Sequence, residues 1–88
     1  MISLPRHANF SNNQARCKGD IQPCIVCGRP CNNPKWTLHI WYGDEVVSES
    51  DATALMAAGK AGGDMGMYPV GSSCLHDHPQ LKLYAIRQ

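Results

Sequence analysis

Four residues have the type and the spacing of a zinc site. Cys24 and Cys27 are separated by two residues in "CIVCGRPC", and Cys74 and His78 are separated by three residues near the end of the sequence. Zn²⁺ binds four ligands in a tetrahedron, and thiolate sulfur and imidazole nitrogen suit it. Two pairs from distant segments would hold both ends of a small domain on one ion. The spacing therefore predicts a structural zinc site made by these four side chains.

The fourth ligand has two alternatives, Cys31 and His76. Cys31 follows the first pair closely, but a free cysteine is commonly a small buried apolar side chain. His78 lies four residues after Cys74, so a helix would place both on one face, whereas His76 would point elsewhere. Pro79 disfavours helical geometry at the residue before it, which keeps His76 in competition. We expect His78 to be the ligand and Cys31 to be a bystander.

Two other chemistries would use cysteines of this kind. A Cys-x2-Cys pair can act as a redox dithiol, but no βαβ pattern surrounds this one. A catalytic zinc keeps one position open for water and needs an acid or base beside it, whereas here four protein ligands are available. The sequence also lacks a phosphate-binding loop and a nucleophile elbow. We therefore expect a protein that is not an enzyme.

A β-hairpin is expected between the two ligand pairs. Residues 36–42 alternate as a strand does, with Leu38, Ile40 and Tyr42 on one face and Trp41 on the other. Gly43 and Asp44 supply the turn, and residues 45–48 supply the returning strand. A third short strand is expected at 67–71, at a sheet edge because Pro69 cannot donate to a ladder.

Two helices follow from capping signals. Ser50 or Asp51 can cap a short helix that ends at Gly59. Ser72 or Ser73 can cap a helix whose first turn carries Cys74. Residues 81–86 fit either a helix or a strand.

The chain divides into a polar arm at residues 1–20 and a single zinc-binding domain at residues 21–88. The arm has no hydrophobic periodicity, so we expect it to be flexible or to lie across the domain without adding to the core. Apolar residues make up 43% of the 88 residues, but they include five cysteines, four methionines and only one phenylalanine. So small a domain has a marginal core, and a metal is expected to stabilise it.

The order of cysteine knuckle, hairpin and C-terminal ligand helix resembles the treble-clef class of zinc fingers. More narrowly, "CIVCGRPC", "WTLHIWYGD" and "DMGMYPVGSSCLHDHP" are similar to a group of small proteins of bacteria, phages and plasmids. These share a CxxCG knuckle, an aromatic hairpin and a PhG-x-x-C segment, in which h is apolar. The resemblance covers roughly residues 22 to 80. It implies a small α+β zinc-stabilised domain with Cys24, Cys27 and Cys74 as ligands and His78 as the fourth, but it implies no biochemical role.

The charge of the chain is unevenly distributed. Residues 1–35 carry five basic side chains and one acidic one, whereas residues 36–59 carry four acidic side chains and no Lys or Arg. We expect the domain to bind another protein, because Trp, Tyr and Met are enriched at such surfaces. The expected contact residues are Trp41, Tyr42, Asp44, Glu45, Met67 and Tyr68. Since the similar proteins are often carried by mobile elements, an inhibitor of a host defence complex is one such role.

The alternative function is nucleic-acid binding by the basic arm, through Arg6, Arg16 and Lys18. The acidic middle of the chain counts against this alternative. The odd number of cysteines and the polar start, without a secretory signal, indicate a cytoplasmic protein with reduced thiols.

Overall fold

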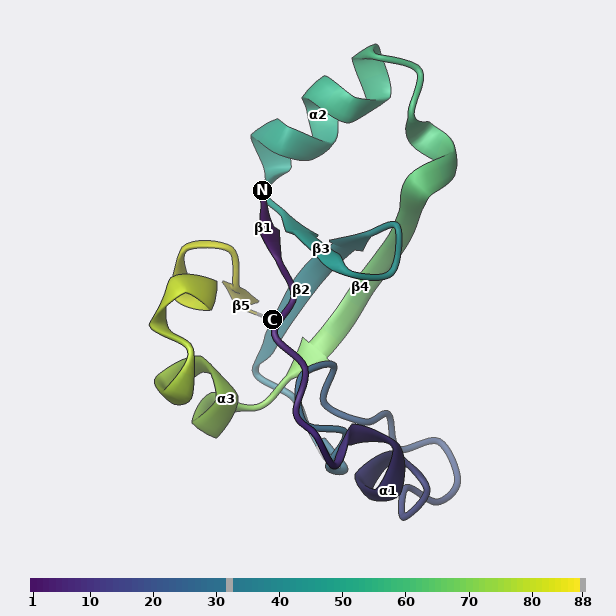
Figure 1. The fold of residues 1–88 in the computed structure, drawn as a ribbon, viewed down its shortest axis with the longest axis vertical. Helices are drawn as coiled ribbons and strands as arrows, with labels where there is room; N and C mark the ends of the chain where they lie inside the picture. Colours follow the sequence, from purple (N-terminus) through teal and green to yellow (C-terminus); the bar gives the residue numbers. More distant parts are fainter. Residues whose placement is uncertain (32, 88) are drawn as a thin grey trace.

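The computed structural model describes residues 1–31 and 33–87. In these residues an antiparallel five-stranded sheet forms the centre of the protein (Figure 1). The central strand β2 (Trp36–Trp41) pairs with β3 (Glu45–Val47) on one side and with β4 (Asp64–Val70) on the other. Strand β1 (Ile2–Ser3) extends the sheet beyond β3, and β5 (Ile86–Arg87) pairs with the start of β2.

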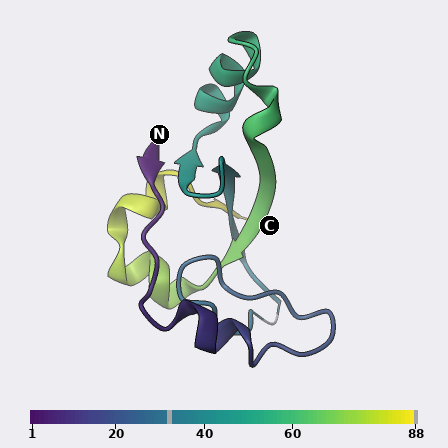
Figure 2. The same ribbon diagram turned by 45° about the vertical axis from the view of Figure 1, so that its right-hand side comes forward.

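Three helices complete the fold. Helix α2 (Glu49–Ala57) lies at one end of the sheet, and α1 (Phe10–Gln14) and α3 (Ser72–Asp77) lie toward the other end (Figures 1 and 2). Short 3-10 helices occur at Ala61–Gly63 and Pro79–Leu83. The expected small α+β class is confirmed.

The hairpin of β2 and β3 is present where the alternation predicts it. Tyr42 (φ 56°) and Gly43 (φ 85°) both take left-handed backbone geometry, and together they reverse the chain. The Tyr42 N–H donates to the carbonyl oxygen of Gly63 at 2.7 Å. Tyr42 therefore ends the strand, and its side chain is 55% exposed instead of joining the face of Leu38 and Ile40.

The helix boundaries differ from the expected ones because other groups cap them. Ser48, not Ser50 or Asp51, is the N-cap of α2: its hydroxyl accepts from the Asp51 N–H, and the Asp51 carboxylate accepts from the Ser48 N–H, both at 3.1 Å. Gly59 ends α2 as expected, with φ 79°.

The end of the chain also differs from expectation. Gly71 is the N-cap of α3, so neither Ser72 nor Ser73 has that role. Residues 81–86 are not one element: the 3-10 helix that begins at Pro79 continues to Leu83, and only Ile86 belongs to strand β5. Strand β4 lies at the sheet edge as expected, but it begins at Asp64 and is longer than the expected 67–71.

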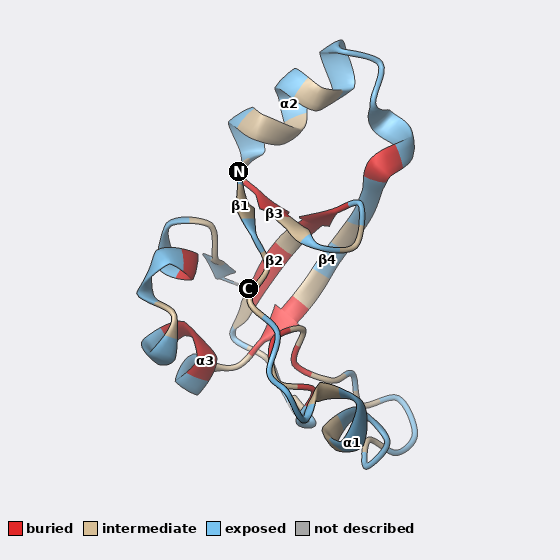
Figure 3. Cartoon of the chain, in the orientation of Figure 1, coloured by how far each residue is buried: buried red, intermediate tan, exposed pale blue. Residues whose placement is uncertain are grey.

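The register places the core side chains of the sheet on one face, and Figure 3 shows buried residues along β2, β3, the end of β4 and α3. The main core contains sheet residues, the knuckle and the C-terminal segment: Leu38, Ile40, Val46, Val70, Cys24, Val26, Cys74, Leu75 and Leu81. Trp41 and Val47 are buried as well, at 0% and 1% exposure, although neither belongs to this cluster. The Trp41 Nε1–H donates to the Lys60 carbonyl oxygen at 3.2 Å. Because the segment around Gly63 covers Trp41, its assignment as a partner-binding residue is wrong.

The polar arm lies across the domain and also contributes to its packing. Ile2 and Leu4 pack against the main core, contrary to the expectation that residues 1–20 add nothing to it. The His7 N–H donates to the Val26 carbonyl oxygen at 2.9 Å, and Asn13 Nδ2 donates to the Cys27 carbonyl oxygen at 2.8 Å. The arm therefore covers the cysteine knuckle.

Candidate metal centre

The segment "CIVCGRPC" folds as a tight knuckle. The Gly28 N–H donates to the Cys24 carbonyl oxygen, and the Cys24 N–H donates to the Arg29 carbonyl oxygen, both at 2.8 Å. Gly28 has φ 81°, and a Cβ atom there would overlap the carbonyl oxygen of Phe10. Only glycine satisfies both the turn and the close approach of α1.

The knuckle is held against the end of β4 and the start of α3. The Ile25 N–H donates to the Pro69 carbonyl oxygen at 2.9 Å, and the Gly71 N–H donates to Cys24 Sγ at 3.2 Å. These contacts bring Cys24 next to Cys74, which lies in the first turn of α3. The sulfur atoms of the two cysteines are 3.7 Å apart.

Three sulfur atoms converge at this point. Those of Cys24, Cys27 and Cys74 all lie within 4.8 Å of one another, and all three cysteines are free thiols. A tetrahedral zinc with Zn–S bonds of about 2.3 Å separates its sulfur ligands by about 3.8 Å. The cluster therefore has the spacing of a metal site, and three of the four expected ligands are together.

The electrostatics of the cluster favour one thiolate. Burial opposes ionisation of Cys24, but the N–H groups of Cys27, Gly71 and Val26, together with the Cys74 thiol, lower its pKa. Burial and the neighbouring Cys24 charge raise the pKa of Cys74. The backbone thus stabilises a thiolate at Cys24, and a bound cation would favour ionisation of Cys74 as well.

His78 lies beside the cluster but outside the group of converging ligands. It lines a small cavity of about 120 Å³ together with Cys27, Cys74 and Asp77. Its backbone is not helical, with φ −126° and ψ 74°, because α3 ends at Asp77, two residues before Pro79. The His78 N–H still donates to the Cys74 carbonyl oxygen at 2.9 Å, so the four-residue helical spacing persists at the end of α3, and both side chains border one cavity.

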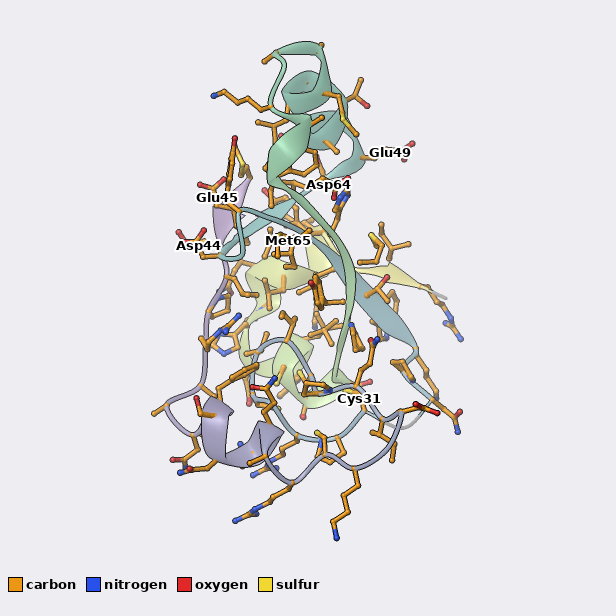
Figure 4. All side chains as sticks on the ribbon, turned by 90° about the vertical axis from the view of Figure 1, so that its right-hand side faces the viewer. Cys31, Asp44, Glu45, Glu49, Asp64 and Met65 are labelled. Carbon is orange, nitrogen blue, oxygen red and sulfur yellow. The ribbon has the colours of Figure 1, made fainter. Side chains whose placement is uncertain are left out.

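Of the two alternative ligands, His76 lies away from the cluster, whereas Cys31 lies beside Cys24, with which its side chain is hydrogen-bonded. His76 lines a separate hollow with Trp36 and Lys82. Cys31 lines a groove with Val70 and Gly71, and Figure 4 shows it near the end of β4. Burial, followed by the charge of Cys24, raises the pKa of Cys31 to about 12. Neither residue belongs to the converging group.

His7 also lines the cavity beside the cluster. Its Nδ1 accepts from the Asn9 N–H at 3.0 Å, so the proton of the neutral ring is on Nε2. The Nδ1 lone pair is therefore engaged by the backbone just before α1. The hydrogen bond from the Gly71 N–H to Cys24 Sγ was not predicted from the sequence. The position of Gly71 just before the expected ligand helix is the signal that could have indicated it.

The other expected contact residues are mostly accessible. Tyr42 is 55% exposed and Met67 is 44% exposed; Asp44 is exposed, while Glu45 and Tyr68 are half-buried. Met65, on the same strand as Met67, is 49% exposed.

The basic side chains of the nucleic-acid alternative, Arg6, Arg16 and Lys18, are exposed. The Arg6 guanidinium lies over the Phe10 ring, 4.3 Å from its centroid.

Comparison with protein-family models, with curated proteins and with solved structures gave no match to this chain. In the part of the chain that the structure describes, no helix has the length and apolar character needed to cross a bilayer. The fold and the site define a small α+β domain whose cysteine cluster can hold a metal ion.

Proposed function

We propose that the cluster binds one Zn²⁺ through Cys24, Cys27 and Cys74, with His78 as the fourth ligand, in a treble-clef-like arrangement. The observation that carries this proposal is the 3.7 Å separation of Cys24 Sγ and Cys74 Sγ. It agrees with the sulfur spacing of about 3.8 Å in a tetrahedral zinc site. His78 borders the same cavity, so a change of its side-chain rotamer would complete the four ligands.

We assign this zinc a structural role. The Cys24 and Cys74 side chains are buried, and the site joins the knuckle, the end of β4 and the start of α3. Four protein ligands would leave no position for a reacting water. The domain would then be a binding module without catalytic activity.

Zinc content and native mass test the metal proposal. Protein purified without added metal should carry one zinc per chain, and a strong chelator should remove it together with the folded state. A chain that has the same native mass and the same circular dichroism with and without chelator would show that no structural metal is present.

We further propose that the module acts by binding another protein. Tyr42, Met65 and Met67 expose apolar side chains near the hairpin turn, and Asp44 and Glu45 supply charge beside them. Aromatic residues and methionine are enriched at protein interfaces. An effector of a mobile element, such as an inhibitor of a host defence complex, is a role consistent with this surface and with the resemblance of the sequence.

A capture experiment with nuclease-treated bacterial lysate tests this second proposal. The immobilised protein should retain a partner at a fixed stoichiometry, and the double variant Tyr42→Ser, Met67→Ser should lose it. Leu83→Ser is the matched control, because Leu83 is 87% exposed and lies in the C-terminal 3-10 helix. Retention that depends on nucleic acid, and that Arg6→Ala or Arg16→Ala abolishes, would instead favour the basic-arm alternative.

A further inference from the structure

The outer edge of β4 has no strand beside it among residues 1–31 and 33–87. The order of the sheet is β1, β3, β2, β4, so β4 is a terminal strand that pairs only with β2. Natural proteins usually cover or charge such edges, because their free N–H and C=O groups pair readily with another chain.

The register shows which backbone groups of β4 point outward. The Tyr42 N–H, one residue beyond β2, donates to Gly63 on the β4 side, so even-numbered residues of β2 face β4. Their partners are Gly66, Tyr68 and Val70. Met67 and Pro69 alternate with these residues, and their backbone groups therefore point away from the sheet.

The knuckle confirms this direction and closes one end of the edge. The outward carbonyl oxygen of Pro69 accepts from the Ile25 N–H at 2.9 Å. The N–H and C=O groups of Met67 therefore point away from β2, toward the side of β4 where the described residues contain no further strand. A strand added here would run along residues 64–67 and would end at Ile25. Its regular backbone pair is at Met67, because the register shifts between Ile40 and Trp41 and the Gly66 N–H donates to Asp64 Oδ1 at 2.9 Å.

A groove runs beside this part of the edge. Its volume is about 280 Å³, and its apolar lining comes from Phe10, Ile25, Ile40, Met65 and Tyr68. In strand addition the backbone supplies hydrogen bonds, and pockets for alternate side chains supply specificity. The groove is placed to receive one apolar side chain of an added strand.

The charges around the edge are mainly acidic. Gly43 lines the groove, and Asp44 follows it; Asp64 begins β4 (Figure 4). Arg6 also lines the groove, where its guanidinium lies over the Phe10 ring. Residues 36–59 contain no Lys or Arg. Asp64 is paired with His39 Nε2 at 2.7 Å, so the exposed Asp44 is the acidic side chain that complements basic residues of an added segment.

We propose that residues 64–67 of β4 receive an extended segment of the partner protein, in which apolar residues facing the groove alternate with basic residues. This inference rests on the proposed protein-binding function and specifies how the partner is recognised. A second copy of the chain fits poorly. Antiparallel pairing of two β4 strands about Met67 would place Met65 of each copy opposite Pro69 of the other, where Ile25 is bound.

Model peptides test the proposal on the full zinc-loaded chain. The probe is acetyl-KVKVK-amide, with acetyl-EVEVE-amide as the charge control and acetyl-KVPVK-amide as the backbone control. Titration followed by amide NMR should shift the Met67 N–H and its β4 neighbours, with the basic peptide binding at least about tenfold more tightly than either control. Absence of shifts at residues 64–67, or equal binding of all three peptides, would overturn the proposal.

A matched pair of variants tests the backbone contact. Met67→Pro removes an N–H that the sheet does not use, and an edge strand tolerates proline, so the fold should persist. Met67→Val changes the side chain but keeps the N–H. Met67→Pro should weaken peptide binding at least about tenfold relative to Met67→Val. Zinc content and the amide spectrum verify that both variants are folded.

These results separate the edge from the wider protein-binding function. If Met67→Pro and Met67→Val retain a captured partner equally well, edge recognition is overturned while protein binding remains in place. Self-association of the chain through β4, seen by sedimentation and abolished by Met67→Pro, would overturn the assignment of a foreign segment as occupant.

Discussion

Cys24 and Cys74 are 50 positions apart in the chain, and their sulfur atoms lie 3.7 Å apart. The Gly71 N–H donates to the same Cys24 sulfur at 3.2 Å, so the knuckle and the start of α3 are already joined through this atom. A metal bound here would add a direct link between the knuckle and α3, whose buried side chains already share the main core. In so small a domain, such a link contributes a large part of the stability.

Replacement of Cys74 should therefore remove both the metal and the fold. Zinc binding in small structural modules has an apparent free energy of about 10 to 16 kcal/mol, which exceeds the net stability of most small domains. We expect Cys74→Ser to lack stoichiometric zinc and to lose its cooperative thermal transition in circular dichroism. Cys17→Ser is the control, because Cys17 donates only to the Gly28 carbonyl oxygen, at 3.6 Å, outside the cluster. Full zinc content in Cys74→Ser would contradict the assignment.

The fourth ligand can be identified with His78→Ala and His76→Ala. His78 borders the cavity beside Cys27 and Cys74, whereas His76 lines a different hollow. Loss of a ligand should reduce metal affinity by more than the 10- to 100-fold typical of groups that only orient ligands. We expect this loss for His78→Ala alone, with a changed visible spectrum of the cobalt-substituted protein.

Cys31→Ser completes this comparison. If it, and not His78→Ala, changes the cobalt spectrum, then the fourth ligand is a thiolate from the knuckle. Unchanged spectra for His78→Ala, His76→Ala and Cys31→Ser would exclude all three residues as the fourth ligand.

Gly28→Ala tests the contact between the arm and the knuckle. An alanine Cβ would overlap the Phe10 carbonyl oxygen, and φ 81° is costly for any residue with a Cβ. Gly19→Ala is a matched control, since φ is 65° there and no atom lies within 4 Å. We expect about 1 to 2 kcal/mol of destabilisation for the control and about 1 to 3 kcal/mol more for Gly28→Ala, measured by urea unfolding. Equal losses would mean that α1 does not pack on Gly28 in solution.

The local features of the fold could be predicted, because short-range patterns determine them. Strand alternation from Trp36, the turn at Gly43 and the paired cysteines of the knuckle each follow from neighbouring residues. The sequence also indicated that Cys74 meets this knuckle, since zinc chemistry supplies a reason for a long-range contact.

The errors concern contacts that no local pattern encodes. Trp41 was expected at the surface because nothing near it in sequence indicates that the segment around Gly63 covers it. Ile2 and Leu4 are isolated apolar residues in a polar arm, so only the completed sheet shows where they pack. Pro79 created a real ambiguity, and the structure resolves it by ending α3 before His78.

Gly63→Ala tests the covering of Trp41. A Cβ at Gly63 would lie 2.5 Å from Trp41 Nε1, and Trp41 cannot move because it is fully buried. We expect a loss of about 1 to 3 kcal/mol and a change in tryptophan fluorescence. Gly62→Ala should change stability by less than about 1 kcal/mol, because no atom lies within 4 Å of its Cβ position. A neutral Gly63→Ala would contradict the burial of Trp41.

Asp64 should make stability depend on pH in the acid range. His39 Nε2 lies 2.7 Å from Asp64 Oδ1, and this contact, followed by the Gly66 N–H, lowers the pKa of Asp64 below its usual value of 3.8. A group whose pKa is lower in the folded state stabilises the protein above its unfolded pKa, and this contribution is lost as the pH falls through the folded pKa.

Comparison of the wild-type protein with Asp64→Asn isolates this contribution from proton competition at the metal site, because both proteins share the cysteine cluster. The difference in their unfolding free energies should shrink as the pH falls below about 4. A carbon-13 titration of the Asp64 carboxyl group gives the folded pKa directly. A difference that stays constant to pH 3, or an Asp64 pKa at or above its usual value, would show that the His39 contact does not form in solution.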